Sequence, residues 1–151
     1  MKKSNIFGRN DKRKVNPNWF TSKTWMKVLS DKIKSKDQDI YHVHFERGSK
    51  TKLHWHNGNQ VLIATKGKGS LEIFRKYGSS KTNFKIKRKE KITLNEGDIV
   101  HIPAKTLHTH GSIDKKKTFS HIAINILPKK NAIYKTTWYE SDFKTKVSEI
   151  I

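Results

Sequence analysis

Cysteine is absent from this chain of 151 residues, which excludes disulfide bonds and thiolate metal sites. Long apolar runs are absent too, since no stretch approaches the about 18 uncharged apolar residues of a membrane-spanning helix. The basic N-terminus is not followed by an apolar stretch, so it lacks the pattern of a secretory signal. These absences favour a cytoplasmic protein that does not enter a membrane.

Acidic residues are scarce as well: 13 Asp and Glu stand against 33 Lys and Arg, and the formal net charge is +20. Such a charge is typical of proteins that bind nucleic acid or another polyanion. Most of the basic residues are lysines spread along the chain, however, and arginine, which contacts bases and phosphates with two parallel hydrogen bonds, is rare. No nucleic-acid-binding motif occurs. A polyanion partner and a lysine-rich solvated surface therefore both stay open.

Helical periodicity is absent as well. Short segments in which apolar and polar residues alternate, separated by turns, fill the sequence instead. In residues 39–45, for example, Tyr41, Val43 and Phe45 alternate with two histidines. Further strands are expected at residues 24–29, 51–56, 60–65, 70–74, 118–127 and 134–141, with two more inside 91–112. Only residues 142–151 could form a helix. The pattern predicts an all-β fold, a small antiparallel barrel or sandwich.

The length of the chain suits one domain. We expect a basic N-terminal arm at residues 1–21, a barrel at 22–140 and a C-terminal tail at 141–151. Within the barrel, a basic insertion at about 77–90 contains a candidate hairpin at Gly78–Ser80.

Two histidine clusters carry the chemistry. His54 and His56 lie two residues apart, so on a strand they project from the same face, roughly 7 Å apart. Gln60 follows a turn that contains Gly58 and can return toward them, while His108 opens a strand much later in the chain. Such histidines can simply be solvated, but two clusters beside glycine turns favour a metal site.

For the remaining histidines and tryptophans we expect a place outside the metal site. His42 and His44 alternate against the apolar face of their strand and should lie on the outer face or at an oligomer interface. His101 could lie on either face. Trp55 and Trp138 are interpreted as packing residues.

The spacing of the first cluster resembles the first motif of the cupin superfamily. Gly48, then His54-Trp-His56, Gln60 and Gly67 follow one another at that motif's intervals, with Gln60 where a glutamate is usual. This resemblance implies a single-domain cupin, an all-β double-stranded β-helix of jelly-roll type.

The second cluster resembles the second cupin motif. Gly97, Pro103 and His108 have its spacing, whereas Lys105 replaces a usual glycine and Ser112 a usual asparagine. Together the two motifs extend the resemblance over about residues 22–139.

The glutamine makes the chain similar to small cupins that include manganese-dependent hydroxynitrile lyases. That resemblance implies His54, His56, Gln60 and His108 as metal ligands. It also implies His121 and His110 as catalytic residues lining the pocket, although a packed core histidine is the alternative for His121. One divalent ion per subunit is expected, with manganese foremost and Fe, Ni, Cu, Co or Zn as alternatives.

Three neutral imidazoles and an amide oxygen would leave the full charge on the ion and open positions for a substrate. The prediction is a metal-dependent enzyme on a small organic substrate, with Lewis-acid chemistry and a histidine of ordinary pKa, near 6.5, moving the proton. A dioxygenase of quercetinase type and a non-enzymatic metal or ligand binder are the alternatives. We also expect a homo-oligomer, a dimer or tetramer, through the N-terminal arm or first strand.

Overall fold

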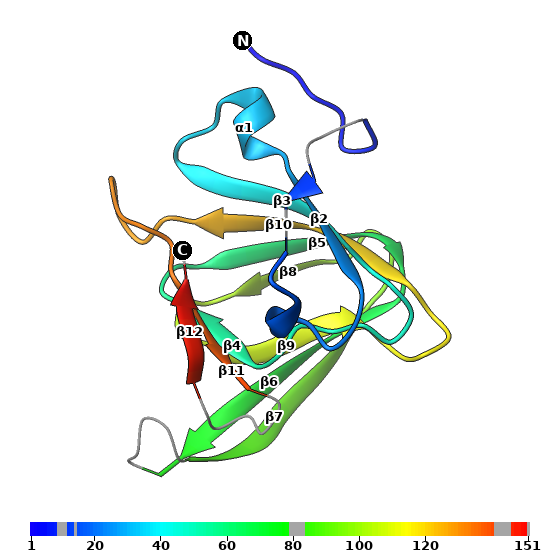
Figure 1. The fold of residues 1–151 in the computed structure, drawn as a ribbon, viewed down its shortest axis with the longest axis vertical. Coiled ribbons are helices and arrows are strands. Elements are labelled where there is room, and N and C mark those ends of the chain that lie inside the picture. Colours follow the sequence, from blue (N-terminus) through cyan, green and yellow to red (C-terminus); the bar gives the residue numbers. More distant parts are fainter. Residues whose placement is uncertain (9–11, 14, 79–83, 141–145, 151) are drawn as a thin grey trace.

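Two antiparallel sheets of six strands each form the structure, a computed structural model that describes residues 1–8, 12–13, 15–78, 84–140 and 146–150 (Figure 1). The first sheet has the order β1-β2-β3-β10-β5-β8. Its strands are β1 (Lys12–Arg13), β2 (Thr24–Val28), β3 (Gln38–Phe45), β10 (Phe119–Ile126), β5 (Gln60–Gly67) and β8 (Ile99–Ile102). The all-β prediction is confirmed.

The second sheet has the order β12-β11-β4-β9-β6-β7. Its strands are β12 (Lys146–Ile150), β11 (Thr136–Tyr139), β4 (His54–His56), β9 (Leu107–Ser112), β6 (Gly69–Tyr77) and β7 (Lys85–Leu94). The chain crosses between the sheets repeatedly, as in a jelly roll, so that β4 and β9, far apart in sequence, become neighbours.

Helical structure lies elsewhere than expected. A short helix, α1, spans Ser30–Ile33, and one 3-10 turn spans Pro17–Trp19. The helix considered for the C-terminal tail is wrong, because Lys146–Ile150 pairs antiparallel with β11 as strand β12. The physical reason is that this segment contains the β-branched residues Val147 and Ile150, and β11 offers it an edge of unpaired backbone groups. In the part of the chain that the structure describes, no helix is long and apolar enough to cross a membrane.

Part of the N-terminal segment packs against the barrel. Strand β1 pairs with β2, and Phe20 is buried in the main core. Trp19 stacks on Trp138 with ring centroids 5.2 Å apart. Apolar surface of their own chain therefore covers Trp19 and Phe20, while the homo-oligomer expected through the N-terminal arm or first strand stays a prediction.

The main core lies between the sheets and follows the predicted alternation. Val43 and Phe45 are buried, with Tyr41 packed against the same cluster. His42 and His44 lie on the opposite face of β3, where they contact Thr65 Oγ1 at 3.3 Å and Ser120 Oγ at 2.6 Å. Their outward placement is confirmed.

A second apolar cluster lies on the outer face of the second sheet. It consists of Leu53, Phe84, Leu107 and Tyr139 with Trp55, Phe74 and Ile86 packed against them. Strands β6 and β7 pair antiparallel around the predicted insertion, and Phe84 in it reaches this cluster. The hairpin predicted at Gly78–Ser80 falls mostly outside the described residues. The insertion thus has a packing role, and Trp55, like Trp138, packs as predicted.

Candidate metal centre

His54 and His108 face each other from neighbouring strands. They are paired in the register of β4 and β9, and their ring centroids are 4.2 Å apart. His54 Nδ1 lies 2.8 Å from the carbonyl oxygen of Lys52, and His108 Nδ1 lies 2.8 Å from that of Thr106. Because a carbonyl only accepts, each Nδ1 carries the hydrogen, and each Nε2 has a free lone pair.

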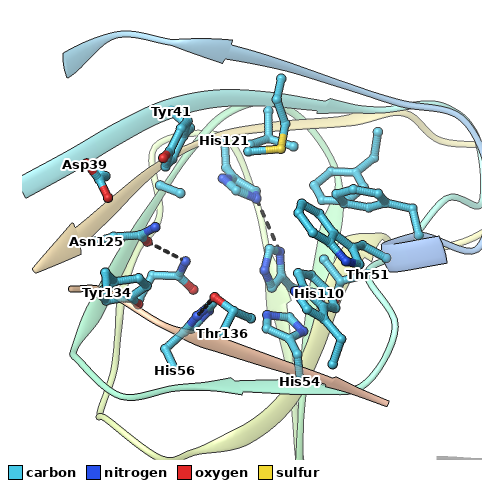
Figure 2. Close-up of a pocket in the computed structure, with 18 residues that line it drawn as sticks. Asp39, Tyr41, Thr51, His54, His56, His110, His121, Asn125, Tyr134 and Thr136 are labelled. Carbon is cyan, nitrogen blue, oxygen red and sulfur yellow. Dashed lines mark hydrogen bonds between the residues drawn. The ribbon is translucent and has the colours of Figure 1, made fainter. Parts of the chain in front are cut away.

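His56 and Gln60 lie beside this pair. His56 Nδ1 lies 2.7 Å from Thr136 Oγ1 (Figure 2), while the His56 ring centroid lies 4.9 Å from that of His54. Gln60 Nε2 donates to Asn125 Oδ1 at 2.8 Å, which leaves the carbonyl oxygen Oε1 for other partners.

Three buried polar atoms at this place have no hydrogen-bond partner: His56 Nε2, His108 Nε2 and Gln60 Oε1. Unpaired buried polar atoms are rare and costly, about 1–3 kcal/mol each. All three are good ligands for a divalent metal ion. These residues therefore fit the metal that the first motif implies.

His110 belongs to the same cluster. Ligand atoms of His54, His108 and His110 all lie within 4.8 Å of one another, so this triad can also hold a metal ion. His110 Nδ1, however, already lies 3.2 Å from His121 Nε2.

The histidines of the candidate metal centre are uncharged at neutral pH. Burial, followed by the neighbouring histidines, lowers the pKa of His54 and of His56 well below the ordinary value. Burial lowers the pKa of His108 to about 4. Because a metal binds the neutral imidazole, the low pKa values keep the site ready for an ion down to mildly acidic pH.

Two backbone positions shape the site. A Cβ on Gly58 would lie 2.4 Å from the carbonyl oxygen of Ile126 and 2.9 Å from Tyr134 Cε2, so the turn that brings Gln60 toward His56 requires glycine. Lys105 has a φ of 64°, the left-handed conformation that the usual glycine of this motif adopts readily, and its N–H donates to the carbonyl of His56 at 2.7 Å.

His110 and His121 come from opposite sheets and meet across the cavity (Figure 2). His121 is fully buried, and burial, followed by the charge of His42, lowers its pKa to about 3. The expectation of an ordinary pKa for His121 is therefore wrong, because the sequence does not show how completely the barrel removes this side chain from water. Its Nδ1 has no hydrogen-bond partner. His101 is exposed on β8, away from the site.

The candidate ligands His54, His56 and Gln60 line a cavity of about 90 Å³ between the sheets. The cavity is lined by Trp19, Phe20, Met26, Asp39, Tyr41, Val43, Phe45, Thr51, His54, His56, Gln60, His110, His121, Ala123, Asn125, Tyr134, Thr136 and Trp138. Sequence reasoning missed Asp39, Asn125, Tyr134 and Thr136 as site residues. The positions of Asp39 and Asn125 could have been found by parity, since Asp39 shares the face of Tyr41 and Asn125 that of His121.

Comparison with known proteins agrees with this arrangement. Residues 8–149 match the family described as Cupin. The chain belongs to the cupin family. Its structure is similar to a cupin-like protein from Thermotoga maritima, with a TM-score of 0.65, 30% identity, and coverage of 91% of this chain and 90% of that one. The cupin resemblance predicted from the two motifs is confirmed, whereas its hydroxynitrile lyase-like branch stays a prediction.

Two structures of lower sequence identity share the fold alone. Oxalate decarboxylase from Bacillus subtilis has a TM-score of 0.52 and 22% identity, over 68% of this chain and 25% of that one. The 7S globulin of Momordica charantia has a TM-score of 0.60 and 12% identity, over 85% and 35%. Curated protein sequences gave no match to the chain.

Proposed function

We propose that this cupin binds one divalent metal ion through His54, His56, Gln60 and His108 and acts as an enzyme on a small organic substrate. The observation that carries the proposal is the set of buried, unpartnered ligand atoms on His56, Gln60 and His108. Manganese is the preferred ion, on the resemblance to manganese-dependent cupins, with Fe, Ni, Cu, Co and Zn as alternatives of suitable ligand chemistry.

The hydrogen bonds of the two side chains make His56 a better metal ligand than His110. His56 Nε2 has no partner, and its other ring nitrogen is held by Thr136. His110 Nδ1 is engaged with His121, so binding a metal through that atom would break a buried contact. We therefore assign His110 to the substrate side of the cavity.

The donor set determines the chemistry that a bound ion would supply. All four side chains are uncharged, so the ion would keep its full charge and polarise a substrate hydroxyl or carbonyl as a Lewis acid. The remaining work falls to the protein. His110 and His121, held together as neutral imidazoles, present nitrogens that can accept or pass on a substrate proton. The low pKa makes His121 a weak base, so it can accept only an acidic proton from a donor that lies close.

Carbon–carbon bond cleavage of the hydroxynitrile lyase type is the proposed reaction, with dioxygenase chemistry as the alternative for the same ligand set. The proposed substrate is a small molecule, because the cavity is small and the histidines lie at its buried end.

The absence of cysteine supports a cytoplasmic location. The charge of +20 keeps a polyanion partner as a further possibility that a salt-dependent binding assay would test.

The two candidate ligand sets are distinguished by metal analysis of matched variants. His56→Ala should lose most of its bound manganese after dialysis against excess Mn²⁺ and desalting, while His110→Ala should keep about one ion per chain. The reverse result would assign the ion to the triad of His54, His108 and His110. Full manganese retention in both variants and in His108→Ala would place the ion elsewhere.

A further inference from the structure

Positive charge is concentrated where β6 ends and β7 begins. Residues 75–91 contain eight Lys or Arg and one acidic residue, Glu90, whereas the whole chain has 33 Lys or Arg in 151 residues. Seven of the eight basic residues lie in the part of the chain that the structure describes, and all seven are exposed: Arg75, Lys76, Lys85, Lys87, Arg88, Lys89 and Lys91. The charge of the chain is therefore not spread evenly over its surface.

Beyond Phe74 the two strands continue without the rest of their sheet. β6 pairs with β9 from Gly69 to Phe74, whereas among the described residues Arg75–Tyr77 pair with Lys85–Lys87 of β7 alone. We call this two-stranded end, Arg75–Tyr77 with Lys85–Lys87, the basic ribbon. It lies at the lower end of the view in Figure 1, away from the first sheet. Side chains of the basic ribbon can therefore reach solvent on a face that the barrel core does not cover.

The two faces of the basic ribbon differ. Ile86 of β7 packs against the outer apolar cluster together with Phe74. Because side chains alternate along a strand, the neighbours of these residues project from the opposite face. Four exposed side chains make up that face: Arg75 and Tyr77 on β6, and Lys85 and Lys87 on β7. An aromatic ring, 45% exposed in its residue, thus lies among three cations.

These cations have no acidic residue to offset them on the basic ribbon. Arg75 lies directly opposite Lys87 in the strand register, and like charges held about 5 Å apart at Cβ destabilise a sheet. Glu72, the acidic residue of β6, is already paired with Lys50 at 2.9 Å and with Arg88 at 3.0 Å. Among the described residues neither Arg75 nor Lys87 forms an ion pair. A bound polyanion would relieve this repulsion.

Protection of an exposed strand edge explains single charges on the basic ribbon but not this pairing. Lysines often prevent edge strands from pairing with other chains. An opposite-charge pair would block the edge equally and would attract across the two strands. The face instead combines cations, which neutralise phosphates, with an exposed tyrosine, a platform on which a base can stack.

A single-stranded nucleic acid suits this combination better than a duplex or a membrane. The bases of a single strand are free to stack on an aromatic side chain, whereas those of a duplex are paired in its interior. An anionic membrane supplies negative charge but no bases. The tyrosine among the cations therefore favours the single strand.

We propose that the basic ribbon binds single-stranded RNA or DNA, with Arg75, Lys85 and Lys87 on phosphates and Tyr77 stacked on a base. The binding is independent of base sequence, because the contacts go to the backbone and to the flat face that every base has. It does not rest on the proposed metal site.

Fluorescence anisotropy of labelled oligo(U) and oligo(dT), each of about 15 nucleotides, measures the binding to untagged, nuclease-treated protein. We expect micromolar dissociation constants at about 50 mM salt and about twentyfold weaker binding at about 200 mM, because three phosphate contacts to a single strand give a salt slope of about −0.7 each. Tighter binding of oligo(U) would assign RNA as the partner, and tighter binding of oligo(dT) would assign DNA; both support the proposal.

Matched variants locate the site. Arg75→Gln combined with Lys87→Gln should weaken binding at least about tenfold and reduce the salt slope by about 1.4. Tyr77→Ala should weaken oligo(dT) binding about tenfold but leave the binding of heparin, a polyanion without bases, as in the wild type. Lys129→Gln combined with Lys130→Gln removes the same charge from exposed residues outside the basic ribbon and should bind like the wild type. Thermal unfolding checks that the variants are folded.

Several outcomes would overturn the proposal. They are no binding of either strand at about 50 mM salt, an equal loss in the two double variants, and full oligo(dT) binding by Tyr77→Ala. Tighter binding of a duplex of the same length, or of phosphatidylserine vesicles, than of the single strands would also overturn it. Chelated protein should give the same affinities as untreated protein, so this test stands or fails separately from the metal analysis.

Discussion

Asn125 holds the amide of Gln60 by a buried hydrogen bond, with 2.8 Å between Gln60 Nε2 and Asn125 Oδ1. The two residues are paired on neighbouring strands β10 and β5. Because the nitrogen of Gln60 is engaged in this way, its oxygen is the atom left without a partner in the metal site. Asn125 is thus a positioning residue for the proposed ligand.

Asn125→Leu should therefore weaken manganese binding by about ten- to a hundredfold, the usual cost of losing a residue that orients a ligand. Asn125→Asp keeps an acceptor for the Gln60 amide and should bind within a few-fold of the wild type. Calorimetric Mn²⁺ titration measures both, and thermal unfolding checks that the two variants are folded. Equal affinities in Asn125→Leu and the wild type would show that Gln60 needs no such orientation.

The metal-free protein should lose stability as the pH falls below about 6.5, the ordinary histidine value. His108 and His121 take up a proton only near their lowered pKa values of about 4 and about 3, whereas in the unfolded chain they do so near 6.5. Between these values the unfolded state binds more protons, so each residue lowers the free energy of unfolding by up to about 1.4 kcal/mol per pH unit.

Urea unfolding of chelated protein at pH 7 and pH 5 should therefore show a loss of about 2–4 kcal/mol from these two residues. His108→Gln should flatten the pH dependence, while the exposed His101→Gln should leave it as in the wild type. A stability that stays constant from pH 7 to pH 5 would mean that these histidines are not buried in the neutral form.

The sequence predicted the fold well because the two cupin motifs and the strand alternation are local patterns. His54 and His56 share a face by parity alone, and Gly58 and Gly97 stand where turns require them. What the sequence could not show depends on chain segments that meet only in the folded protein. The pKa of His121 depends on burial by both sheets, and the partnership of Gln60 with Asn125 depends on the register of β5 and β10.

His121→Ala should bind metal normally and lose roughly 10²–10⁴ in rate, the typical contribution of a group that moves a proton. Its side chain lines the cavity and contacts His110, but it makes no contact with the four proposed ligands among the ring contacts of the described residues. Cleavage of mandelonitrile, followed by benzaldehyde absorbance, is the first assay. His101→Ala provides the control on an exposed histidine. Full turnover by His121→Ala would remove the proton-transfer role and leave the metal site untouched.

The outer face of the first sheet should be the interface of a homodimer. Isoleucine and valine side chains cover it across four strands: Ile40, Ile122, Ile124, Ile126, Val61, Ile63 and Ile99. Ile99 is 68% exposed and Ile126 39%. The outward positions of the central strand β10 carry no Lys, Arg, Asp or Glu, whereas Lys66 opposite Ser120 and Lys27 opposite His42 lie toward the edges of this face. A second copy would cover these isoleucine and valine side chains and leave the two lysines at the margin of the contact.

Light scattering after gel filtration should therefore give the mass of a dimer for the wild type. Ile124→Lys, at the centre of the face, should give a folded monomer, and Ile133→Lys, on an exposed isoleucine outside it, should remain dimeric. A monomeric wild type at tens of micromolar would contradict this interface, as would a dimer that survives Ile124→Lys.

Calorimetric titration of Mn²⁺ into chelated protein at neutral pH tests the metal site most directly. The account predicts saturation at one ion per chain in the wild type and loss of at least about a hundredfold in affinity in His108→Ala, whose imidazole belongs to both candidate ligand sets. His101→Ala should titrate like the wild type. Failure of the wild type to bind Mn²⁺, Fe²⁺, Co²⁺, Ni²⁺, Cu²⁺ or Zn²⁺, or equal binding by wild type and His108→Ala, would contradict the central claim.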